Sequence, residues 1–408
     1  MRLTIVNSTA PGTASLLAPF FSAVADAPEM ALTVMEQMAA RDAARAQAES
    51  SARRYRLEPA PTYWYHRRHA CAQVLAPGFG RQLQASCPDA IYLLGEAGYL
   101  SSFQVVRFAR RHLPATKLFL FAAQNVYQQF PPPFPSVERW VLARIDHAFP
   151  LGCDHEDVLR RKGYRGAVTH LPLGVDARVF APARHDALKR ELNLPSPVVG
   201  YVGDFLPARN LPLLIQAVAA LRPPVGLLIV GDGSGREDLQ AQCQALGIGD
   251  RTRFVGRVPH TRVPDYLNCM DLVVLPSIAV RNRCFGLFEI ANAEQFGRAL
   301  IEAMACGKPV VGSTCGEIPT VIGNAGRVFR EGDLGALTFV LEKLCANPAL
   351  RKRLGQAGLA RARTHYDWRV IAGRFVATVE EIVLGAQADA KRRYPDEART
   401  PAATAAAS

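Results

Sequence analysis

The chain has 408 residues, of which 49% are hydrophobic and 21% are charged, and its formal net charge is +12. This length and composition predict a globular protein of two domains and exclude an intrinsically disordered one. No apolar run approaches the roughly 18–20 residues that a bilayer-spanning helix needs, so none is expected.

The positive charge fits three kinds of partner: nucleic acid, an anionic membrane surface or a phosphate-bearing ligand. The basic residues form no compact tract and no nucleic-acid-binding motif is present, so we expect no nucleic-acid partner. A peripheral contact with an anionic membrane stays open. The nine cysteines are scattered without any Cys-x-x-Cys pair. This pattern predicts a protein of the reducing cytoplasm, the inner face of the membrane included, with neither a disulfide framework nor a zinc site.

The first half of the chain alternates strand-like and helix-like segments. The expected elements lie at residues 2–6, 14–25, 90–94, 101–111 and 118–121. Residues 36–56, rich in Ala, Arg and Glu, are expected to form a long surface helix or a loop. Strands that alternate with helices predict an α/β fold with a parallel sheet and crossover helices.

Parallel sheets bind ligands beyond the carboxyl ends of their strands, so the loops at residues 7–12, 95–102 and 124–134 should face a cleft. Gly12, Glu96 and Asn125 lie in or beside these loops and are candidates for binding a ligand. The alternatives are a helix cap for Glu96 and a turn for Asn125.

A second alternation begins at residue 198, after a segment that we expect to be a helical linker. Its expected elements lie at residues 198–203, 211–221, 226–230, 254–258 and 271–277. The glycine-rich residues 231–235 follow a strand, but their spacing is not Gly-x-Gly-x-x-Gly, which indicates a turn and not a dinucleotide site.

Two glutamates, Glu294 and Glu302, enclose the most informative segment of the chain. Gly297 lies between them and permits a close backbone approach to a ligand, and the unpaired amides of residues 299–301 form an anion site at the mouth of a short helix. A buried strand at residues 310–311 follows. A carboxylate accepts two hydroxyl hydrogen bonds, so two carboxylates beside a phosphate site suggest a grip for a sugar nucleotide. The alternative is a surface helix that follows a buried strand.

The segment Glu-Gln-Phe-Gly-Arg-Ala-Leu-Ile-Glu-Ala-Met-Ala-Cys-Gly-Lys-Pro-Val-Val, residues 294–311, resembles the Glu-x7-Glu motif of retaining family 4 glycosyltransferases of the GT-B fold. The resemblance covers about residues 88–384 and is most specific over residues 198–322. It implies two Rossmann-like doubly wound domains that face each other across a cleft. We expect an acceptor-binding domain at residues 1–180, a linker at 181–197 and a nucleotide-sugar-binding domain at 198–366. A helix at 367–386 is expected to cross back to the first domain, and a disordered tail is expected at 387–408.

The resemblance also implies a reaction, the transfer of a sugar from a nucleoside-diphosphate-sugar to an acceptor hydroxyl with retention, in the biosynthesis of glycans, glycolipids or glycosylated metabolites. Glu294 and Arg209 are the expected catalytic residues, on the donor sugar and the diphosphate, and Glu302 is expected to hold the ribose diol. Further donor-binding positions are expected at Gly203, Arg257, Val258, Phe296, Gly297, Arg298, Ala299, Leu300 and Ile301. The resemblance also implies that loops of the first domain bind the acceptor, with Glu96, Asn125 and Gly12 as the candidate residues. No cofactor beyond the donor is expected and no metal, in agreement with the absence of an Asp-x-Asp pair from the sequence.

The chain departs from the family at Asp204, which stands where relatives carry an arginine on the diphosphate. Either the local alignment slips, or activity is weakened, or a neighbour supplies the charge. The candidate neighbours are Arg257, Arg281, Arg283 and Arg298. Residues 278–293 form a longer segment than most relatives have, either a lid that carries such an arginine or a surface excursion. The remaining alternatives are a pseudo-transferase that binds nucleotide or a partner, and a nucleotide-sugar epimerase or phosphorylase on the same fold.

Overall fold

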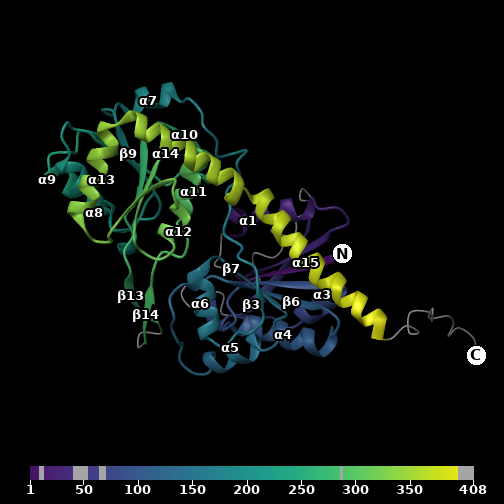
Figure 1. Ribbon diagram of the computed structural model, residues 1–408. Helices are drawn as coiled ribbons and strands as arrows, with labels where there is room; N and C mark the ends of the chain where they lie inside the picture. The colour runs from purple at the N-terminus through teal and green to yellow at the C-terminus, as the bar shows by residue number, and fades with distance from the viewer. Residues whose placement is uncertain (9–12, 40–53, 64–69, 285–287, 394–408) are drawn as a thin grey trace, which may run out of the picture.

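The computed structural model describes residues 1–8, 13–39, 54–63, 70–284 and 288–393, which form two α/β domains (Figure 1). The first domain contains an eight-stranded sheet in the order β4-β3-β2-β1-β5-β6-β7-β8, parallel except for the β3–β4 pair at its edge. Its strands are β1 (Arg2–Asn7), β2 (Ala31–Met38), β3 (Arg56–Tyr63), β4 (Val74–Leu75), β5 (Ala90–Leu94), β6 (Lys117–Ala122), β7 (His147–Pro150) and β8 (Ala167–Val168).

The second domain contains a six-stranded parallel sheet in the order β11-β10-β9-β12-β15-β16. Its strands are β9 (Val198–Val202), β10 (Gly226–Val230), β11 (Thr252–Gly256), β12 (Leu272–Leu275), β15 (Val310–Ser313) and β16 (Gly326–Phe329). Every residue of β5, β10 and β12 is buried, as expected of central parallel strands that helices cover on both faces. In both sheets the strand order reverses beside the first strand, at β1/β5 and β9/β12, where doubly wound sheets bind ligands.

Helices cover both sheets. In the first domain they are α1 (Thr13–Ala25), α3 (Phe79–Ala85), α4 (Leu100–His112), α5 (Phe134–Leu142) and α6 (Cys153–Arg161). In the linker and the second domain they are α7 (Asp186–Leu192), α8 (Leu211–Ala220), α9 (Arg236–Ala245), α10 (Val263–Cys269), α11 (Arg298–Ala305), α12 (Ile318–Ile322), α13 (Leu334–Ala346) and α14 (Pro348–Arg361). None of the described helices is long and apolar enough to cross a membrane.

The last helix, α15 (Trp368–Arg393), leaves the second domain and runs across the first (Figure 1). Trp368, Ile371 and Phe375 pack with Phe20 of α1 in the core of the first domain. The helix continues seven residues past the expected boundary at 386, so residues 387–393 are helical and the expected disordered tail does not begin at 387. Residues 394–408 lie outside the described residues.

The chain crosses between the domains twice, and the two crossings are hydrogen-bonded to each other. Leu171 and Trp368 belong to the core of the first domain, whereas Val175 and Tyr366 belong to the core of the second. The Val175 amide donates to the Tyr366 carbonyl at 2.7 Å, and the Trp368 amide donates to the Val175 carbonyl at 3.2 Å.

Two segments differ from the sequence-based expectations. Residues 36–38 complete strand β2, and β3 begins at Arg56, where a helix or loop over 36–56 was expected; residues 40–53 lie outside the described residues. The pairing of β2 with β1 and β3, together with burial of Met35 and Met38, overrides the local helical preference. In the segment 278–293, β13 (Val280–Cys284) and β14 (Phe288–Asn292) form an antiparallel hairpin.

Candidate active site

The helix α11 begins at a glycine in the left-handed region, as the Glu-x7-Glu segment predicted. Gly297 has φ +82°, and a side chain there would also approach Leu275 and Leu300 closely. The Leu300 amide donates to the Gly297 carbonyl at 2.9 Å, so the expectation that this amide is unpaired is wrong. The amides of Arg298 and Ala299 are left as the anion site, because the first turn of a helix has no internal acceptors for them.

The side chains within this segment have different roles from its backbone. Phe296, Leu300 and Ile301 are buried, and the Phe296 ring packs edge-on against Tyr366 at a centroid distance of 5.7 Å. These three residues can therefore reach a ligand only through their backbone. Arg298 is the exception, because its guanidinium lies at the wall of a cavity between the domains.

Glu294 lies immediately before this helix and forms an ion pair with Arg209. The Ser277 hydroxyl donates to Oε2 of Glu294 at 3.0 Å, the oxygen that the Arg209 guanidinium also contacts. Only 9% of the Glu294 side chain is exposed, so this carboxylate is held by two donors in a largely desolvated position. The structure thus brings together the two residues expected to be catalytic.

Arg209 and Glu294 line a cavity of about 240 Å³ whose wall comes from both domains. The wall includes Gln124, Asn125, Gln128, Arg209, Ser277 and Glu294. The Asn125 side-chain amide donates to the Glu294 carbonyl at 2.8 Å, which joins the first domain directly to the backbone of the donor-binding segment. Asn125, expected to contact an acceptor, therefore holds a backbone group of the second domain.

Glu302 is buried within α11 and lies outside the lining of that cavity. Its Oε1 atom is 2.9 Å from Nε2 of His260 and 3.6 Å from Nη2 of Arg298. The His260 ring packs against Phe180 at a centroid distance of 5.0 Å. The carboxylate thus lies between the His260 ring and the Arg298 guanidinium.

Asp204, which stands where relatives carry an arginine, lies beside an arginine of this chain. Nη2 of Arg257 lies 3.4 Å from Oδ1 of Asp204, and both side chains are more than half exposed. Arg281 pairs instead with Glu289 across the β13–β14 hairpin at 3.5 Å, and Arg298 contacts Glu302. The side chain of Arg283 lies outside the described residues. Of the described candidates, Arg257 is the one that contacts Asp204.

The remaining donor-side positions lie at the ends of strands. Gly203 follows β9 and has φ +152°, and its amide donates to the Val230 carbonyl at 3.0 Å. A Cβ on Gly231 would lie 1.9 Å from the Gly203 carbonyl oxygen, so the close approach of these two strand ends requires glycine. Val258, next to Arg257, is half-buried.

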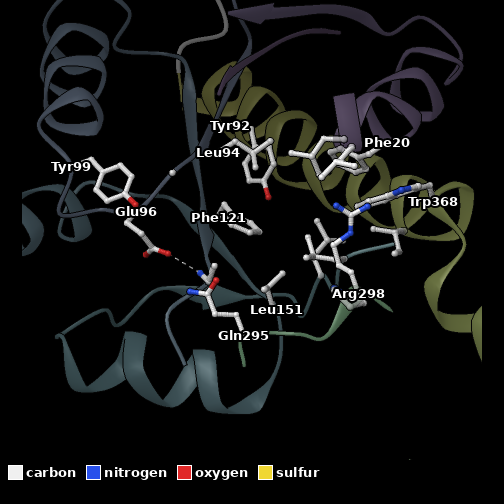
Figure 2. A pocket seen from close by; sticks show the side chains of 18 residues that line it. Phe20, Tyr92, Leu94, Glu96, Tyr99, Phe121, Leu151, Gln295, Arg298 and Trp368 are labelled. Atoms are coloured by element: carbon white, nitrogen blue, oxygen red, sulfur yellow. Dashed lines mark hydrogen bonds between the residues drawn. The ribbon is translucent and has the colours of Figure 1, made fainter. Parts of the chain in front are cut away.

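Glu96 follows β5 and lines a second cavity, of about 320 Å³, on the side of the first domain (Figure 2). Its carboxylate accepts a hydrogen bond from the Ala123 amide at 3.1 Å. Burial raises the pKa of Glu96, although the nearby Lys162 acts in the opposite direction. Gly12 lies outside the described residues. Among those residues no three His, Cys, Asp or Glu side chains gather into a metal site.

The structure adds functional candidates that sequence reasoning missed. Ser277 follows strand β12, and the rule that ligands lie beyond the carboxyl ends of parallel strands points to it. His260 lies in a short 3₁₀ turn after β11, and a lone histidine in such a turn carries no comparable signal.

Comparison with known proteins gives a family. Residues 185–361 match the family model described as glycosyl transferases group 1. The chain is 32% identical over 214 residues to the GDP-mannose-dependent monoacylated alpha-(1-6)-phosphatidylinositol monomannoside mannosyltransferase of Corynebacterium glutamicum, which covers 50% of this chain and 54% of the relative. It is also 32% identical over 220 residues to the GDP-mannose-dependent alpha-(1-6)-phosphatidylinositol monomannoside mannosyltransferase of Mycolicibacterium smegmatis, covering 52% of this chain and 56% of the relative. The chain thus spans about half the length of these curated relatives.

Solved structures match the whole fold. Sucrose-phosphate synthase from Thermosynechococcus elongatus is similar with a TM-score of 0.72 and 21% identity, covering 94% of this chain and 99% of that one. Anabaena Alr3699/HepE in complex with UDP is similar with a TM-score of 0.74 and 19% identity, covering 93% and 100%. Residues 185–361 therefore resemble the glycosyl transferases group 1 family, and the chain as a whole has the GT-B fold of these solved structures.

Proposed function

We propose that the protein is a glycosyltransferase that moves a sugar from a nucleoside-diphosphate-sugar to an acceptor hydroxyl, with retention at the anomeric carbon and without a metal or other cofactor. The observation that carries this proposal is the Arg209–Glu294 ion pair, which lies in a cavity between the domains and beside the start of α11. A cation beside the N-terminus of a helix favours binding of a diphosphate, and a carboxylate can accept hydrogen bonds from the hydroxyls of a sugar.

Each group has a task in this reaction. The donor diphosphate binds at the Arg298 and Ala299 amides and draws the Arg209 guanidinium away from Glu294. Arg209 then stabilises the negative charge that develops on the diphosphate as the bond to the sugar breaks. Glu294 is then free of its ion pair with Arg209 but keeps its hydrogen bond from Ser277, and it accepts hydrogen bonds from the hydroxyls of the sugar. Glu302 and His260 hold the ribose.

The chemical step requires no protein nucleophile. The bond between the anomeric carbon and the diphosphate oxygen breaks, and its electron pair stays on the diphosphate. The acceptor oxygen forms the new bond on the same face of the sugar, and its proton goes to the leaving phosphate oxygen. The protein contributes binding, orientation, charge stabilisation and exclusion of water between its two domains.

The comparisons support this reading of the donor. The two curated relatives are named as dependent on GDP-mannose, and the Anabaena protein has been solved with UDP and with UDP-glucose. The relatives' names also include a phosphatidylinositol monomannoside. With the net charge of +12, we propose that the acceptor is a glycolipid and that transfer takes place at the inner face of a membrane.

A thermal-shift panel of UDP, GDP, ADP and dTDP tests the donor site. At a hundred times its dissociation constant, the matching nucleotide should stabilise the protein by ~2.7 kcal/mol. Glu302→Ala should reduce that response, whereas Glu342→Ala, on an exposed position of α13, should leave it unchanged. No response to any nucleotide, or an equal response from Glu302→Ala, would refute the proposed donor site.

The stereochemical claim needs a separate measurement. Once the donor is known, the anomeric configuration of the first product can be read from its proton NMR spectrum during turnover. A product with the configuration of the donor supports retention, and an inverted product contradicts it.

A further inference from the structure

The cavity of about 320 Å³ lies where the first sheet is expected to bind a ligand. Its wall includes Leu94 at the carboxyl end of β5, Phe121 near the carboxyl end of β6, and Leu151, which follows β7. The helices α1 and α15 close one side of it, and α11 of the second domain contributes Arg298 (Figure 2). We call this cavity the apolar chamber.

The wall of the apolar chamber is unlike that of the cavity at Arg209 and Glu294. Aromatic side chains make up much of it. Phe20, Tyr92 and Trp368 are buried in the core of the first domain, and Phe121 is partly buried against that core. Apolar cavities of this kind hold water poorly and favour an apolar occupant. The charged and amide side chains in the wall are Glu96, Gln295 and Arg298, so a sugar ring or a diphosphate would still face apolar surface over most of its extent.

Among the described residues that line the apolar chamber, Arg298 is the one cation. Figure 2 shows the Arg298 guanidinium directed toward Phe20 and Trp368. Its Nε atom is buried and has no hydrogen-bond partner in the described structure, and its Nη2 lies 3.6 Å from Oε1 of Glu302. An arginine with an unsatisfied donor in a partly desolvated position attracts an anionic oxygen.

Building on the proposed transferase function, we propose that the apolar chamber binds the acceptor, and that this acceptor is an anionic amphiphile. Its apolar group packs against Phe20 and Trp368, and its anionic group, a phosphate or a carboxylate, pairs with Arg298. The volume lies at the lower end of the roughly 300–1,000 Å³ of small-molecule pockets, which fits one compact chain or ring system. Two long acyl chains would extend beyond it.

Arg298 joins the acceptor to the donor site in this arrangement. It is the residue of α11 whose side chain reaches the apolar chamber, and it also contacts the carboxylate that we assign to the ribose. An anion on Arg298 replaces Glu302 as its partner and frees that carboxylate for the donor. Arg298 is therefore a specificity-determining residue for the acceptor.

Calorimetric titration with octyl phosphate, octanoate, octanol and inorganic phosphate tests the proposal in the full-length, nucleotide-free protein. Octyl phosphate or octanoate should bind, and comparison of the two identifies the preferred anion. Octanol lacks the charge and inorganic phosphate lacks the chain, so each should bind about tenfold to a hundredfold more weakly. Equal affinity for octanol and both anions, or no binding of either anionic amphiphile, overturns the proposal.

Two sets of variants, each with a control at an exposed position, locate the site. Arg298→Leu should bring the anionic amphiphiles down to the affinity of octanol, Arg298→Lys should retain most of the binding, and Arg353→Leu, exposed on α14, should change nothing. Leu16→Trp fills the apolar chamber from α1 and should abolish binding, whereas Leu246→Trp, on an exposed position, should not. Unchanged binding in Arg298→Leu or Leu16→Trp refutes the assignment.

The nucleotide thermal shift separates this proposal from the proposed function. Leu16→Trp should keep the response to the matching nucleotide, because Leu16 lies outside the donor site. If wild type binds octyl phosphate through Arg298 but responds to no nucleotide, the donor assignment fails and the anionic-amphiphile site stands. If nucleotides bind and no amphiphile does, the acceptor proposal fails alone.

Discussion

The Nδ1 atom of His155 lies 3.2 Å from Oε1 of Glu317, and these two buried residues come from different domains. The same carboxylate oxygen accepts a hydrogen bond from the Asp154 amide at 3.3 Å. The Glu317 amide donates to the Glu294 carbonyl at 3.0 Å, the same carbonyl that Asn125 contacts. The contact between the domains is therefore continuous with the backbone of the donor-binding segment.

This contact predicts a pH dependence of stability. Burial raises the pKa of Glu317, but the neighbouring His155 ring and the hydrogen bond from the Asp154 amide outweigh it, and the pKa lies below its ordinary value of 4.5. A carboxyl whose pKa is lower in the folded state contributes stability above its unfolded pKa, and that stability is lost as the pH falls through the folded pKa. Urea unfolding at about pH 7 and about pH 4 measures it.

Glu317→Gln should be less stable than wild type at neutral pH, by about 1–3 kcal/mol, and should lose less stability between the two pH values. Glu342→Gln removes an exposed carboxylate and should follow wild type at both. An identical pH response of Glu317→Gln and wild type would show that the contact does not depend on the charge of Glu317.

Removal of Arg209 should slow turnover strongly. Arg209→Ala should lower kcat roughly a hundredfold to a thousandfold, because the developing charge on the diphosphate loses its cation. Arg209→Lys should fall between this variant and wild type, since a lysine keeps the charge but not the planar fork. Release of the nucleoside diphosphate in the presence of both substrates measures kcat, and the melting temperature shows whether each variant is folded. A kcat for Arg209→Ala within about threefold of wild type would contradict the assigned role.

Asp204→Asn should strengthen the binding of the matching nucleoside diphosphate. The Asp204 carboxylate repels the phosphates and holds Arg257, but both side chains are exposed, so the gain should be only about twofold to fivefold in Kd. Calorimetric titration at about 0.05 M and about 0.5 M salt should show the gain shrinking at the higher concentration, where exposed charges are screened. Asp250→Asn is the exposed control. Weaker binding by Asp204→Asn would mean that the aspartate contributes to the donor site directly.

The junction of α15 with the first domain should dominate stability. Phe375 is fully buried, and its ring lies 5.4, 4.8 and 5.1 Å from the ring centroids of Phe20, Tyr92 and Phe149. Phe375→Ala should cost about 3–5 kcal/mol in the free energy of unfolding. Val370→Ala, on an exposed position of the same helix, should change it by less than about 0.5 kcal/mol. Similar changes in the free energy of unfolding for Phe375→Ala and Val370→Ala would show that α15 does not unfold together with the first domain.

Much of the second domain could be predicted from the sequence, because its strands are short apolar runs between clear turn signals. The expected strand 226–230 is β10, and the expected helix 211–221 is α8 less one residue. Strands β2 and β3 were missed because their side chains are mixed in character and the pairing with β1 that stabilises them is non-local.

The candidate site divides in the same way. The motif identified Glu294, Gly297 and Glu302, because their spacing is local. The partners that give these residues their geometry, Ser277, His260 and Asn125, lie on other elements and come close only when both sheets are folded. Gln295 lines both the apolar chamber and the polar cavity at Arg209 and Glu294. The separation of these two cavities depends on tertiary packing, which residue spacing in the sequence does not reveal.

The bonds between Val175, Tyr366 and Trp368 make the two interdomain crossings a single hinge. A bend about this paired segment leaves both hydrogen bonds intact, whereas rotation of one lobe about the long axis would shear them apart. Neither crossing can slide past the other without breaking these two bonds, so the paired segment fixes the register between the two domains.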